Sequence, residues 1–365
     1  MLKLRKHLRD LKPYPIPVKP DNLPENILRL DANENFYELS DEVLRAAEQA
    51  CQASQGYPDD FAGPLRRTIA RVHDLDPDRI SCGRGAMELI SLLVSLYLEP
   101  GLNAVVSQYG YLYFRAAIGY SGADIIIAPE ANLTVDIKAL ASKVDSNTRI
   151  VFVANPANPS GTLISNEQIR QLRVELPDDV LLVVDEAYVE YTDPGVLTPN
   201  FSMADLGNTV ILRTFSKIYG LAGFRVGWGY FPEQISQSMR TIQQPNCVTH
   251  VSQVAAQHAM QQQDRVQFLR EENDRIRRIF SKKLEELGFK VIPSNTSFIL
   301  VHFKDAEQAA AVNQYLRDAG IFVRPMLAYE LPEYLRITIG NESEMARVSE
   351  AVTSYVNQAS LEPDS

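Results

Sequence analysis

Short apolar runs alternate with longer helical stretches through the middle of the chain. The runs are rich in β-branched residues: 103–107 (NAVVS), 124–128 (DIIIA), 149–155 (RIVFVAN), 180–188 (VLLVVDEAY) and 209–215 (TVILRTF). Their nearly continuous apolar character is typical of strands covered on both faces in a largely parallel sheet. Between them, 165–176 (SNEQIRQLRVEL) has helical spacing, and 86–98 (AMELISLLVSLYL) is apolar almost all round, which predicts a buried helix. This alternation predicts an α/β fold with the sheet between helices.

The pattern changes at Asp264, where a long helix is predicted to lead into a second unit. Apolar residues recur at helical spacing through 264–289, with Gly288 as a stop signal. Further strands are predicted at 297–303, 321–325 and 334–340, followed by a closing helix from Asn341, with Glu344 as its capping partner. We therefore predict an N-terminal arm (1–30), a large domain (31–270), and a small domain (271–365) that includes part of the arm.

Composition narrows the class of protein. A chain of 365 residues, 45% hydrophobic and 22% charged, suits a soluble protein with one large and one smaller unit. The net charge of −10 argues against nucleic acid as a partner. No apolar run reaches the roughly 18 residues of a membrane span, and the N-terminal stretch lacks the apolar core of a signal peptide. Three widely separated cysteines indicate a reducing compartment, so we expect a cytoplasmic protein.

Polar residues stand at the carboxyl ends of three predicted strands, where open α/β sheets bind ligands. These segments are NPANPSG (155–161), Asp185 to Tyr188, and Thr214 to Lys217. Each alone has a simpler interpretation: a turn, a helix cap, an exposed lysine. Together they predict that an amide, a carboxylate, a phenol and an amine converge on one crevice. A carboxylate buried there needs a cationic partner.

The cations nearby indicate the ligand. Lys217 lies close in sequence to Arg225, and an amine in such a crevice is a nucleophile for a carbonyl. Arg225 and the hydroxyls of Thr214 and Ser216 suit a phosphate. The apolar helix that follows GRG (83–85) offers free backbone N–H groups to the same anion. An aldehyde for the amine, a phosphate for the cations and a basic ring nitrogen for the carboxylate are combined in pyridoxal 5′-phosphate (PLP).

In order and spacing, the chain resembles the histidinol-phosphate aminotransferase family of fold type I PLP enzymes over almost its whole length. The matching segments are LDANEN (30–35), GYPDD (56–60), GRGAMELI (83–90), QYGYLY (108–113), NPANPSG (155–161), VVDEAYVEY (183–191), RTFSKIYGLAGFRVG (213–227), VRP (323–325) and LRITIG (335–340). The resemblance implies a large domain with a mostly parallel seven-stranded sheet between helices, and a smaller α+β domain.

The resemblance also implies cofactor roles. Lys217 is expected to condense with the PLP aldehyde and to move the substrate α-proton, and Asp185 to pair with the ring nitrogen. Asn158 and Tyr188 are expected to hydrogen-bond the ring 3′-oxygen, and Tyr109 to stack on the ring. The phosphate is expected to be held by Thr214, Ser216, Arg225, the backbone at Ala86 and Met87, and Tyr57 of a partner subunit in a homodimer.

On the substrate side, the resemblance implies that Arg336 grips the α-carboxylate. Arg324 and Tyr14 match positions that hold a substrate phosphate, and Asn33 of LDANEN is expected to contact the substrate. The five histidines are scattered without metal-ligand spacing, so no metal is expected. Glu186 is interpreted as a solvated or helix-start residue.

Several positions depart from the family pattern on the substrate side: Phe36, Met87, Ser107, Gln108, Asn246, Ser297 and the loop 327–330 (LAYE). Because specificity depends on a few well-placed polar groups, these departures bear on the substrate rather than on the cofactor. We predict a PLP-dependent aminotransferase that uses glutamate and 2-oxoglutarate in ping-pong half-reactions, with L-histidinol phosphate as the favoured second substrate.

Other functions were weighed against this one. An aminotransferase for aromatic or other amino acids, or a PLP-dependent decarboxylase of a phosphorylated amino acid, would use the same scaffold. A regulator with a fused DNA-binding module is disfavoured, since the chain is acidic and no helix-turn-helix segment precedes residue 31. A dinucleotide-dependent dehydrogenase is disfavoured because no first strand leads into G-x-G-x-x-G.

Overall fold

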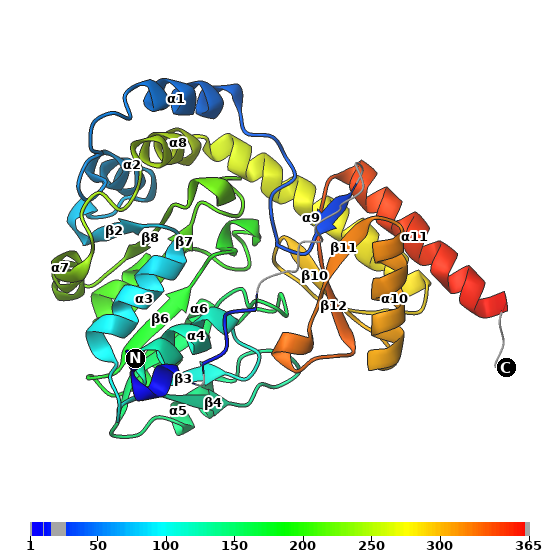
Figure 1. Cartoon of the computed structure of the whole chain (residues 1–365), viewed down its shortest axis with the longest axis horizontal. Coiled ribbons are helices and arrows are strands. Elements are labelled where there is room, and N and C mark those ends of the chain that lie inside the picture. The colour runs from blue at the N-terminus through cyan, green and yellow to red at the C-terminus, as the bar shows by residue number, and fades with distance from the viewer. Residues whose placement is uncertain (1, 10, 16–26, 362–365) are drawn as a thin grey trace.

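The computed structural model describes residues 2–9, 11–15 and 27–361 (Figure 1). Its larger unit is built on a seven-stranded sheet with, in spatial order, β2 (Ile80–Gly83), β8 (Gly227–Tyr230), β7 (Thr209–Thr214), β6 (Leu181–Asp185), β5 (Thr148–Ala154), β3 (Asn103–Ser107) and β4 (Asp124–Ala128). Strand β8 is antiparallel to both of its neighbours, and the pairs from β7 through β4 are parallel. The mostly parallel seven-stranded sheet and its five predicted strands are confirmed. The short strands β2 and β8 escaped the sequence analysis.

Two helical layers cover this sheet. The hydrophobic core on one face takes in helices α1 (Asp41–Gln52), α2 (Gly63–His73), α5 (Ile137–Ser142), α6 (Asn166–Glu175) and α8 (His250–Gln261). The core on the other face takes in α3 (Ala86–Tyr97), α4 (Leu112–Ser121) and α7 (Glu233–Ile242). Along β6, Leu182 and Val184 enter the first core, whereas Leu181 and Val183 enter the second. Burial of both faces explains why these strands read as unbroken apolar runs.

Strand β4 is the exception to this double burial. It lies at the edge of the sheet, and Ile125 and Ile127 remain 37% and 44% exposed. Its apolar run predicted the strand correctly but predicted its burial wrongly. Edge position is decided by which strand pairs with which, and that is a property of the whole sheet.

The smaller unit contains a five-stranded sheet in the order β1 (Leu28–Leu30), β11 (Ile321–Pro325), β12 (Tyr334–Thr338), β10 (Phe298–His302) and β9 (Lys290–Ile292). Helices α10 (Ala306–Asp318) and α11 (Glu342–Leu361) belong to the same unit. The predicted cap of α11 is confirmed, because the backbone N–H of Asn341 donates to Glu344 (2.7 Å) and that of Glu344 donates to the Asn341 side chain (3.0 Å).

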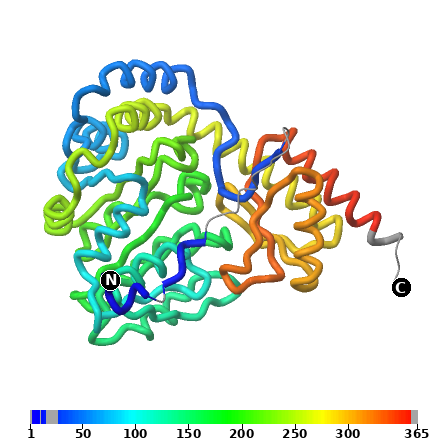
Figure 2. The backbone as a smooth tube through the Cα atoms, in the orientation of Figure 1, coloured from blue at the N-terminus to red at the C-terminus, as the bar shows by residue number. Residues whose placement is uncertain are grey.

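Helix α9 (Gln263–Glu286) connects the two units (Figure 2). Its first half places Val266 and Leu269 in the core of the large unit, and its second half places Ile276 and Phe280 in the core of the small one. Strand β1 of the N-terminal arm pairs in parallel with β11 of the small sheet. We therefore keep the proposed division near residue 270, with β1 assigned to the small domain.

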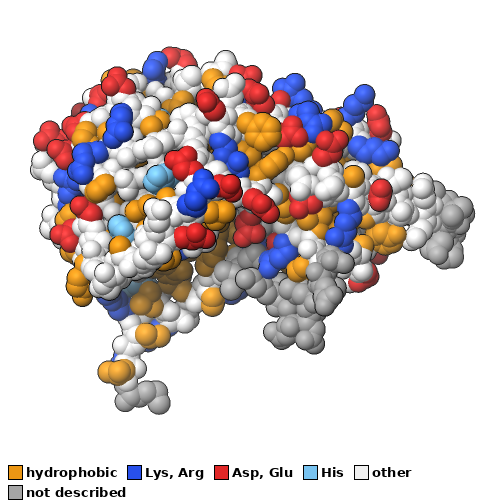
Figure 3. Space-filling model, turned by 90° about the horizontal axis from the view of Figure 1, so that it is seen from above, with side chains coloured by type: hydrophobic (Ala, Val, Ile, Leu, Met, Phe, Trp, Pro, Cys, Tyr) orange, Lys and Arg blue, Asp and Glu red, His pale blue; other side chains and the backbone are white. Residues whose placement is uncertain are grey.

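Short 3-10 helices complete the description: η1 (Lys6–Leu8), η2 (Pro77–Arg79), η3 (Val189–Tyr191), η4 (Phe201–Leu206), η5 (Ala222–Phe224) and η6 (Leu327–Tyr329). Part of the predicted arm, residues 16–26, lies outside the described residues. Within the described part of the chain, no helix combines the length and apolarity that crossing a membrane requires. Acidic and basic side chains intermingle over the face drawn in Figure 3.

Candidate active site

A cavity of about 420 Å³ lies between the two units. Its lining includes most of the residues predicted to bind a cofactor or substrate: Tyr14, Asn33, Ala86, Met87, Asn158, Asp185, Tyr188, Thr214, Ser216, Lys217, Arg225, Arg324 and Arg336. Tyr57 and Tyr109 are the two predicted residues that do not line it. Strand ends of the large sheet, the start of α3 and strands of the small sheet thus meet at one place, as an α/β sheet requires of its ligand site.

Lys217 follows strand β7 and points its amine at the backbone turn at Ala32 and Asn33, just after strand β1. Its Nζ atom donates to the carbonyl oxygens of Asn33 (3.1 Å) and Ala32 (3.4 Å). The same Nζ lies 5.5 Å from the ring centroid of Tyr188. Asn33 has a φ of 55°, a left-handed conformation that asparagine tolerates better than most residues. The amine is therefore held by neutral oxygens and a ring face within the cavity.

Asp185 ends strand β6 and is buried. One carboxylate oxygen accepts the backbone N–H of Ala187 at 3.1 Å. Burial raises the pKa of Asp185 to about 6, while that N–H and the charge of Lys217 oppose the rise. Because these groups offset only part of the cost of burying its negative charge, the carboxylate is suited to pair with a cationic group of a ligand.

The start of helix α3 forms an anion site with Arg225. The helix N-cap is Gly85, so no side chain caps the N–H groups of the first turn, and Ala86 and Met87 of that turn line the cavity. A Cβ on Gly85 would lie 2.7 Å from Arg225 Nη2, and one on Gly227 would lie 2.4 Å from the Ala86 nitrogen. Both glycines are thus required for the close approach of the arginine and strand β8 to the helix start, where anions bind.

The hydroxyls predicted to join this anion site adjoin Arg225. Arg225 Nη1 lies 3.4 Å from Ser216 Oγ and donates to the Ala222 carbonyl at 2.8 Å. Thr214 Oγ1 accepts the Ser216 backbone N–H at 3.1 Å. One arginine, two hydroxyls and a helix start form a donor set of the size and charge that a phosphate group needs.

Two arginines face each other at the other side of the cavity. Arg324 on β11 is directly opposite Arg336 on β12 in the antiparallel register. Arg336 donates to the side-chain oxygen of Asn158 and to the Asp31 carbonyl (3.2 Å), and Arg324 donates to the Pro15 carbonyl (3.0 Å). Like charges opposite each other destabilise a sheet unless an anion lies between or beside them. The pair therefore indicates a second anion site.

Three tyrosines complete this side. Tyr14 of the arm is partly buried, and burial raises its pKa. Tyr111 and Tyr329 line the cavity as well, and burial raises the pKa of each well above its ordinary value. On the opposite side, the Tyr188 hydroxyl accepts from the Asn33 amide at 2.9 Å. Tyr14, Tyr111 and Tyr329 thus hold their protons and can donate them to an anion.

Comparison with known proteins decides the family. The family model for aminotransferases of class I and II matches residues 25–352. The chain belongs to this aminotransferase family. A histidinol-phosphate aminotransferase of Granulibacter bethesdensis is 37% identical over 341 residues, or 93% of this chain and 92% of the relative. Another, of Cereibacter sphaeroides, is 38% identical over 334 residues, or 91% of each chain.

A solved structure gives the same result for the fold. The histidinol-phosphate aminotransferase from Sinorhizobium meliloti, crystallised in complex with pyridoxal-5'-phosphate, matches with a TM-score of 0.85 and 30% sequence identity over 91% of each chain. The predicted resemblance and the fold type I architecture are confirmed. The protein is an aminotransferase, as predicted.

One predicted residue of the aminotransferase is placed differently. Tyr109 packs on the small unit beside Met326 and Leu331. Its backbone N–H donates to Glu130 at 3.1 Å. Tyr111 lies on the cavity wall instead. The turn that closes after β3, with the Gly110 N–H bonded to the Ser107 carbonyl, turns the chain between the two tyrosines. The stacking role of Tyr109 stays a prediction, and Tyr111 is a second aromatic residue available on the cavity wall.

Glu186 corrects one prediction. Its side chain is fully buried and forms an ion pair with the equally buried Arg213 at 2.9 Å, so the solvated interpretation is wrong. Burial raises the pKa of Glu186 to about 7 despite that partner. The pair joins the end of β6 to the end of β7, directly beside Asp185 and close to Lys217. A charged residue after a strand gave no sign of this burial in the sequence.

Other residues reach the cavity without having been predicted. Tyr329 lies on η6, between the strands that carry the two arginines, and is 6% exposed. Asp31 and Glu34 line the cavity next to Asn33. The segments LAYE and LDANEN contained the only available signals, and neither distinguishes one polar residue from its neighbours. Tyr57 is 93% exposed, and its role toward a partner subunit stays a prediction.

Proposed function

We propose that this aminotransferase binds PLP and transfers an amino group between L-glutamate and imidazole acetol phosphate, forming 2-oxoglutarate and L-histidinol phosphate. The observation that carries the proposal is the pairing of two anion sites in one cavity. Arg225 and the start of α3 lie at one side, and the facing Arg324 and Arg336 lie at the other. The names of the relatives support the substrate, and their similarity to this chain extends over nearly its whole length.

The residues present fit the cofactor. A Cβ at Gly85 or Gly227 would collide with Arg225 or with the start of α3, so only glycine keeps these groups close together. Their close approach suits a phosphate bound against backbone N–H groups. When bound, PLP supplies an aldehyde for the lysine amine and a ring that accepts electrons from the substrate α-carbon. Thr214, Ser216, Arg225, Ala86 and Met87 would hold its phosphate, with Tyr111 against the ring.

The chain's own groups would then carry the proton steps. Lys217 Nζ, already inside the cavity, would take the proton from the substrate α-carbon and later return it. Asp185 would keep a positive charge on the ring nitrogen, and the cation would in turn lower the raised pKa of this carboxyl. Asn158 and Tyr188 would orient the ring oxygen, because each already has a side-chain partner fixing it.

Arg336 would bind the α-carboxylate of L-glutamate by a two-pronged contact, a group that L-histidinol phosphate lacks. Arg324 and Tyr14 would bind the phosphate of L-histidinol phosphate or, in the other half-reaction, the distal carboxylate of glutamate. Asn33 would complete the substrate contact beside Lys217. We also propose that the enzyme acts as a homodimer in which Tyr57, fully accessible in one chain, reaches the cofactor phosphate of the partner.

A second candidate is an aminotransferase for aromatic amino acids. The observation that favours it is the tyrosine-rich wall formed by Tyr14, Tyr111, Tyr188 and Tyr329, which could pack against an aromatic side chain. Decarboxylation of a phosphorylated amino acid would use the same anion sites.

The absorbance of the purified protein tests these proposals. If PLP is bound, an absorbance band near the visible edge is expected. Borohydride reduction followed by mass analysis should then find the cofactor attached to Lys217. The band should bleach with L-glutamate and with L-histidinol phosphate but not with L-phenylalanine. Bleaching by phenylalanine alone would establish the second candidate, carbon dioxide release without amino transfer would establish decarboxylation, and a missing label on Lys217 would refute the cofactor assignment.

A further inference from the structure

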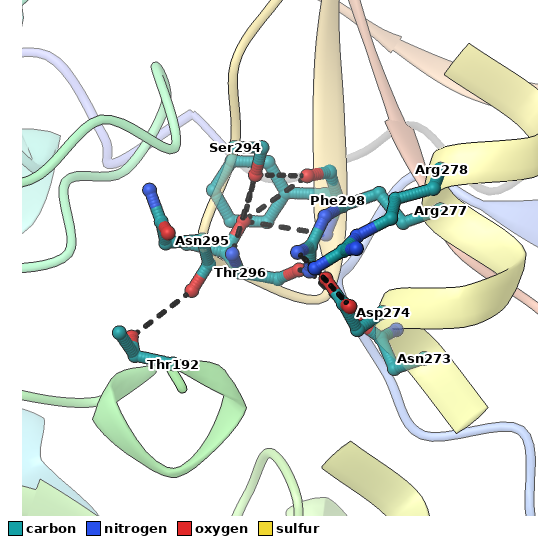
Figure 4. A network of polar contacts seen from close by, with 9 residues as sticks. All are labelled: Thr192, Asn273, Asp274, Arg277, Arg278, Ser294, Asn295, Thr296 and Phe298. Carbon is teal, nitrogen blue, oxygen red and sulfur yellow. Dashed lines mark hydrogen bonds and ion pairs between the residues drawn. The ribbon is translucent and has the colours of Figure 1, made fainter. Parts of the chain in front are cut away.

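A self-bonded turn, Ser294–Thr296, lies where the two units of the protein meet (Figure 4). The Ser294 hydroxyl contacts that of Thr296 (2.9 Å), accepts the Thr296 backbone N–H (3.2 Å) and donates to the Phe298 carbonyl (2.6 Å). Thr296 Oγ1 also donates to that carbonyl at 3.1 Å. Because the turn satisfies its own side chains, it behaves as one rigid piece, and its remaining backbone groups are available to neighbours.

The large domain holds this turn from one side. The Asn295 N–H donates to the Gly161 carbonyl (2.9 Å), and the Asn295 carbonyl accepts from the buried Thr192 hydroxyl (3.3 Å). A Cβ on Gly161 would lie 2.3 Å from Ser294 Oγ, so the contact is close. Gly161 lies in the loop that carries Asn158, and Thr192 follows the segment that carries Tyr188. The turn therefore touches the two loops that bear residues of the active site.

Arg277 of α9 holds the turn from the small-domain side (Figure 4). Arg277 is 8% exposed, and its guanidinium donates to the Thr296 carbonyl (2.9 Å), the Asn273 side chain (3.2 Å) and Asp274 (2.6 Å). A buried ion pair is weak evidence for stability, since apolar residues of similar size often serve as well. The planar fork of arginine is instead suited to fixing several acceptors in one geometry.

The turn leads directly into Phe298, which lies between the two sides of the active site. The ring of Phe298 is fully buried and meets the Tyr188 ring edge-on, with centroids 5.2 Å apart. The guanidinium carbon of Arg336 lies 5.2 Å from the centroid of the same ring. A shift of the turn would thus move the surface on which Arg336 rests, relative to Tyr188 of the large domain.

We propose that Arg277 is a positioning residue for the substrate carboxylate: through the turn 294–296 and Phe298, it sets where Arg336 stands relative to the large-domain half of the site. The inference rests on the proposed role of Arg336. Arg277 itself does not line the active-site cavity, so its removal should weaken binding of the amino donor and leave the chemical step almost unchanged.

Arg278 offers a matched control. It forms an ion pair with the same Asp274 at 2.7 Å, yet its side chain is 76% exposed and has no contact with the turn among the described residues. Arg277→Met and Arg278→Met therefore remove the same charge from adjacent positions of one helix. Only the first removes the contact to Thr296.

The experiment measures single-turnover bleaching of the cofactor band of the holoenzyme at rising L-glutamate concentration. Arg277→Met should raise the apparent Kd about tenfold and keep the limiting rate within about twofold. Arg278→Met should leave both within about twofold, and Arg277→Lys should fall between wild type and Arg277→Met. Thermal midpoints of all variants are recorded, and the kinetics are run well below the lowest of them.

The outcomes separate cleanly. A wild type that does not respond to glutamate overturns the proposed function and this inference with it. If the wild type responds to glutamate, two results would overturn the inference alone. One is an equal Kd for the two Met variants, and the other is a lower thermal midpoint of Arg277→Met without a change in Kd. If Arg277→Met does not fold, Thr192→Val loosens the turn from the other side and should raise Kd about threefold, the scale of one lost hydrogen bond. An unchanged Kd in that variant would then refute the proposal.

Discussion

The two sides of the cavity are built from different kinds of structure. The side that carries Lys217, Asp185 and Arg225 comes from neighbouring strands of one sheet and from a helix start packed against them. The side that carries Arg324 and Arg336 comes from the small sheet and is tied across the cavity by single hydrogen bonds to Pro15, Asp31 and Asn158. We call these the sheet side and the arginine side.

This difference indicates where each function is robust. Groups on the sheet side are positioned by a continuous core, so their geometry does not depend on how the two domains meet. Groups on the arginine side depend on the domain junction and on the arm. We therefore expect changes on the sheet side to abolish the chemistry, and changes on the arginine side to alter affinity and substrate choice.

Lys217→Ala, on the sheet side, should cause the largest loss of activity. Without the amine, the enzyme loses both the covalent attachment of the cofactor and the base for the α-proton, so kcat should fall by at least about 10⁴-fold. The half-reaction with L-glutamate, followed by absorbance, measures this. A residual rate within tenfold of wild type would show that another group does the work of Lys217.

Asp185→Asn should lower kcat by about 10³-fold, because the ring nitrogen loses its anionic partner. It should also stabilise the cofactor-free protein at high pH. Burial raises the pKa of Asp185 to about 6 from the ordinary 3.8, so the unfolded chain loses this proton before the folded chain does, and stability falls as the pH rises between those values.

The stability part has its own measurement. Urea unfolding of the cofactor-free protein at pH 8 should give Asp185→Asn a free energy of unfolding up to about 3 kcal/mol above wild type, and almost no difference at pH 4. A variant that is less stable at pH 8 would mean that the carboxylate is better compensated in the fold than its burial indicates.

On the arginine side, Arg336→Ala should raise KM for L-glutamate by about 10²-fold with a smaller effect on kcat, since it removes a charge-assisted contact to the α-carboxylate. Arg324→Ala should raise KM by about tenfold or more for L-histidinol phosphate and leave the KM of a donor without a second anionic group unchanged. Equal effects of the two variants on all donors would erase the distinction between the two arginines.

Tyr111→Leu and Tyr109→Leu test which of these two tyrosines contributes to cofactor binding. Loss of an aromatic wall should weaken cofactor binding about tenfold for Tyr111, whereas Tyr109, which packs away from the cavity, should change it by less than about twofold. Equilibrium dialysis of PLP from the two variants provides the measurement. The reverse order would support the predicted stacking role of Tyr109.

The sequence predicted the sheet side well and the arginine side less completely. Asp185 and Lys217 each follow an apolar strand directly, so local periodicity places them at the same edge of the sheet. Tyr109, Tyr111 and Tyr113 alternate along one short segment, and nothing in their spacing shows which one the turn at Gly110 directs to the cavity. The burial of Glu186 was missed because its partner Arg213 comes from another strand.

The sequence by itself determined the five central strands, the polar residues at their ends and a set of donors suited to a phosphate, because periodicity and turn chemistry act over a few neighbouring residues. Only the tertiary structure decided that β4 lies exposed at an edge, that Arg324 and Arg336 stand opposite each other, and that Arg277 holds the turn beneath Phe298. These features depend on pairing and packing between segments far apart in the chain. The free energy of such a contact depends on both segments, so the local sequence of either one does not predict it.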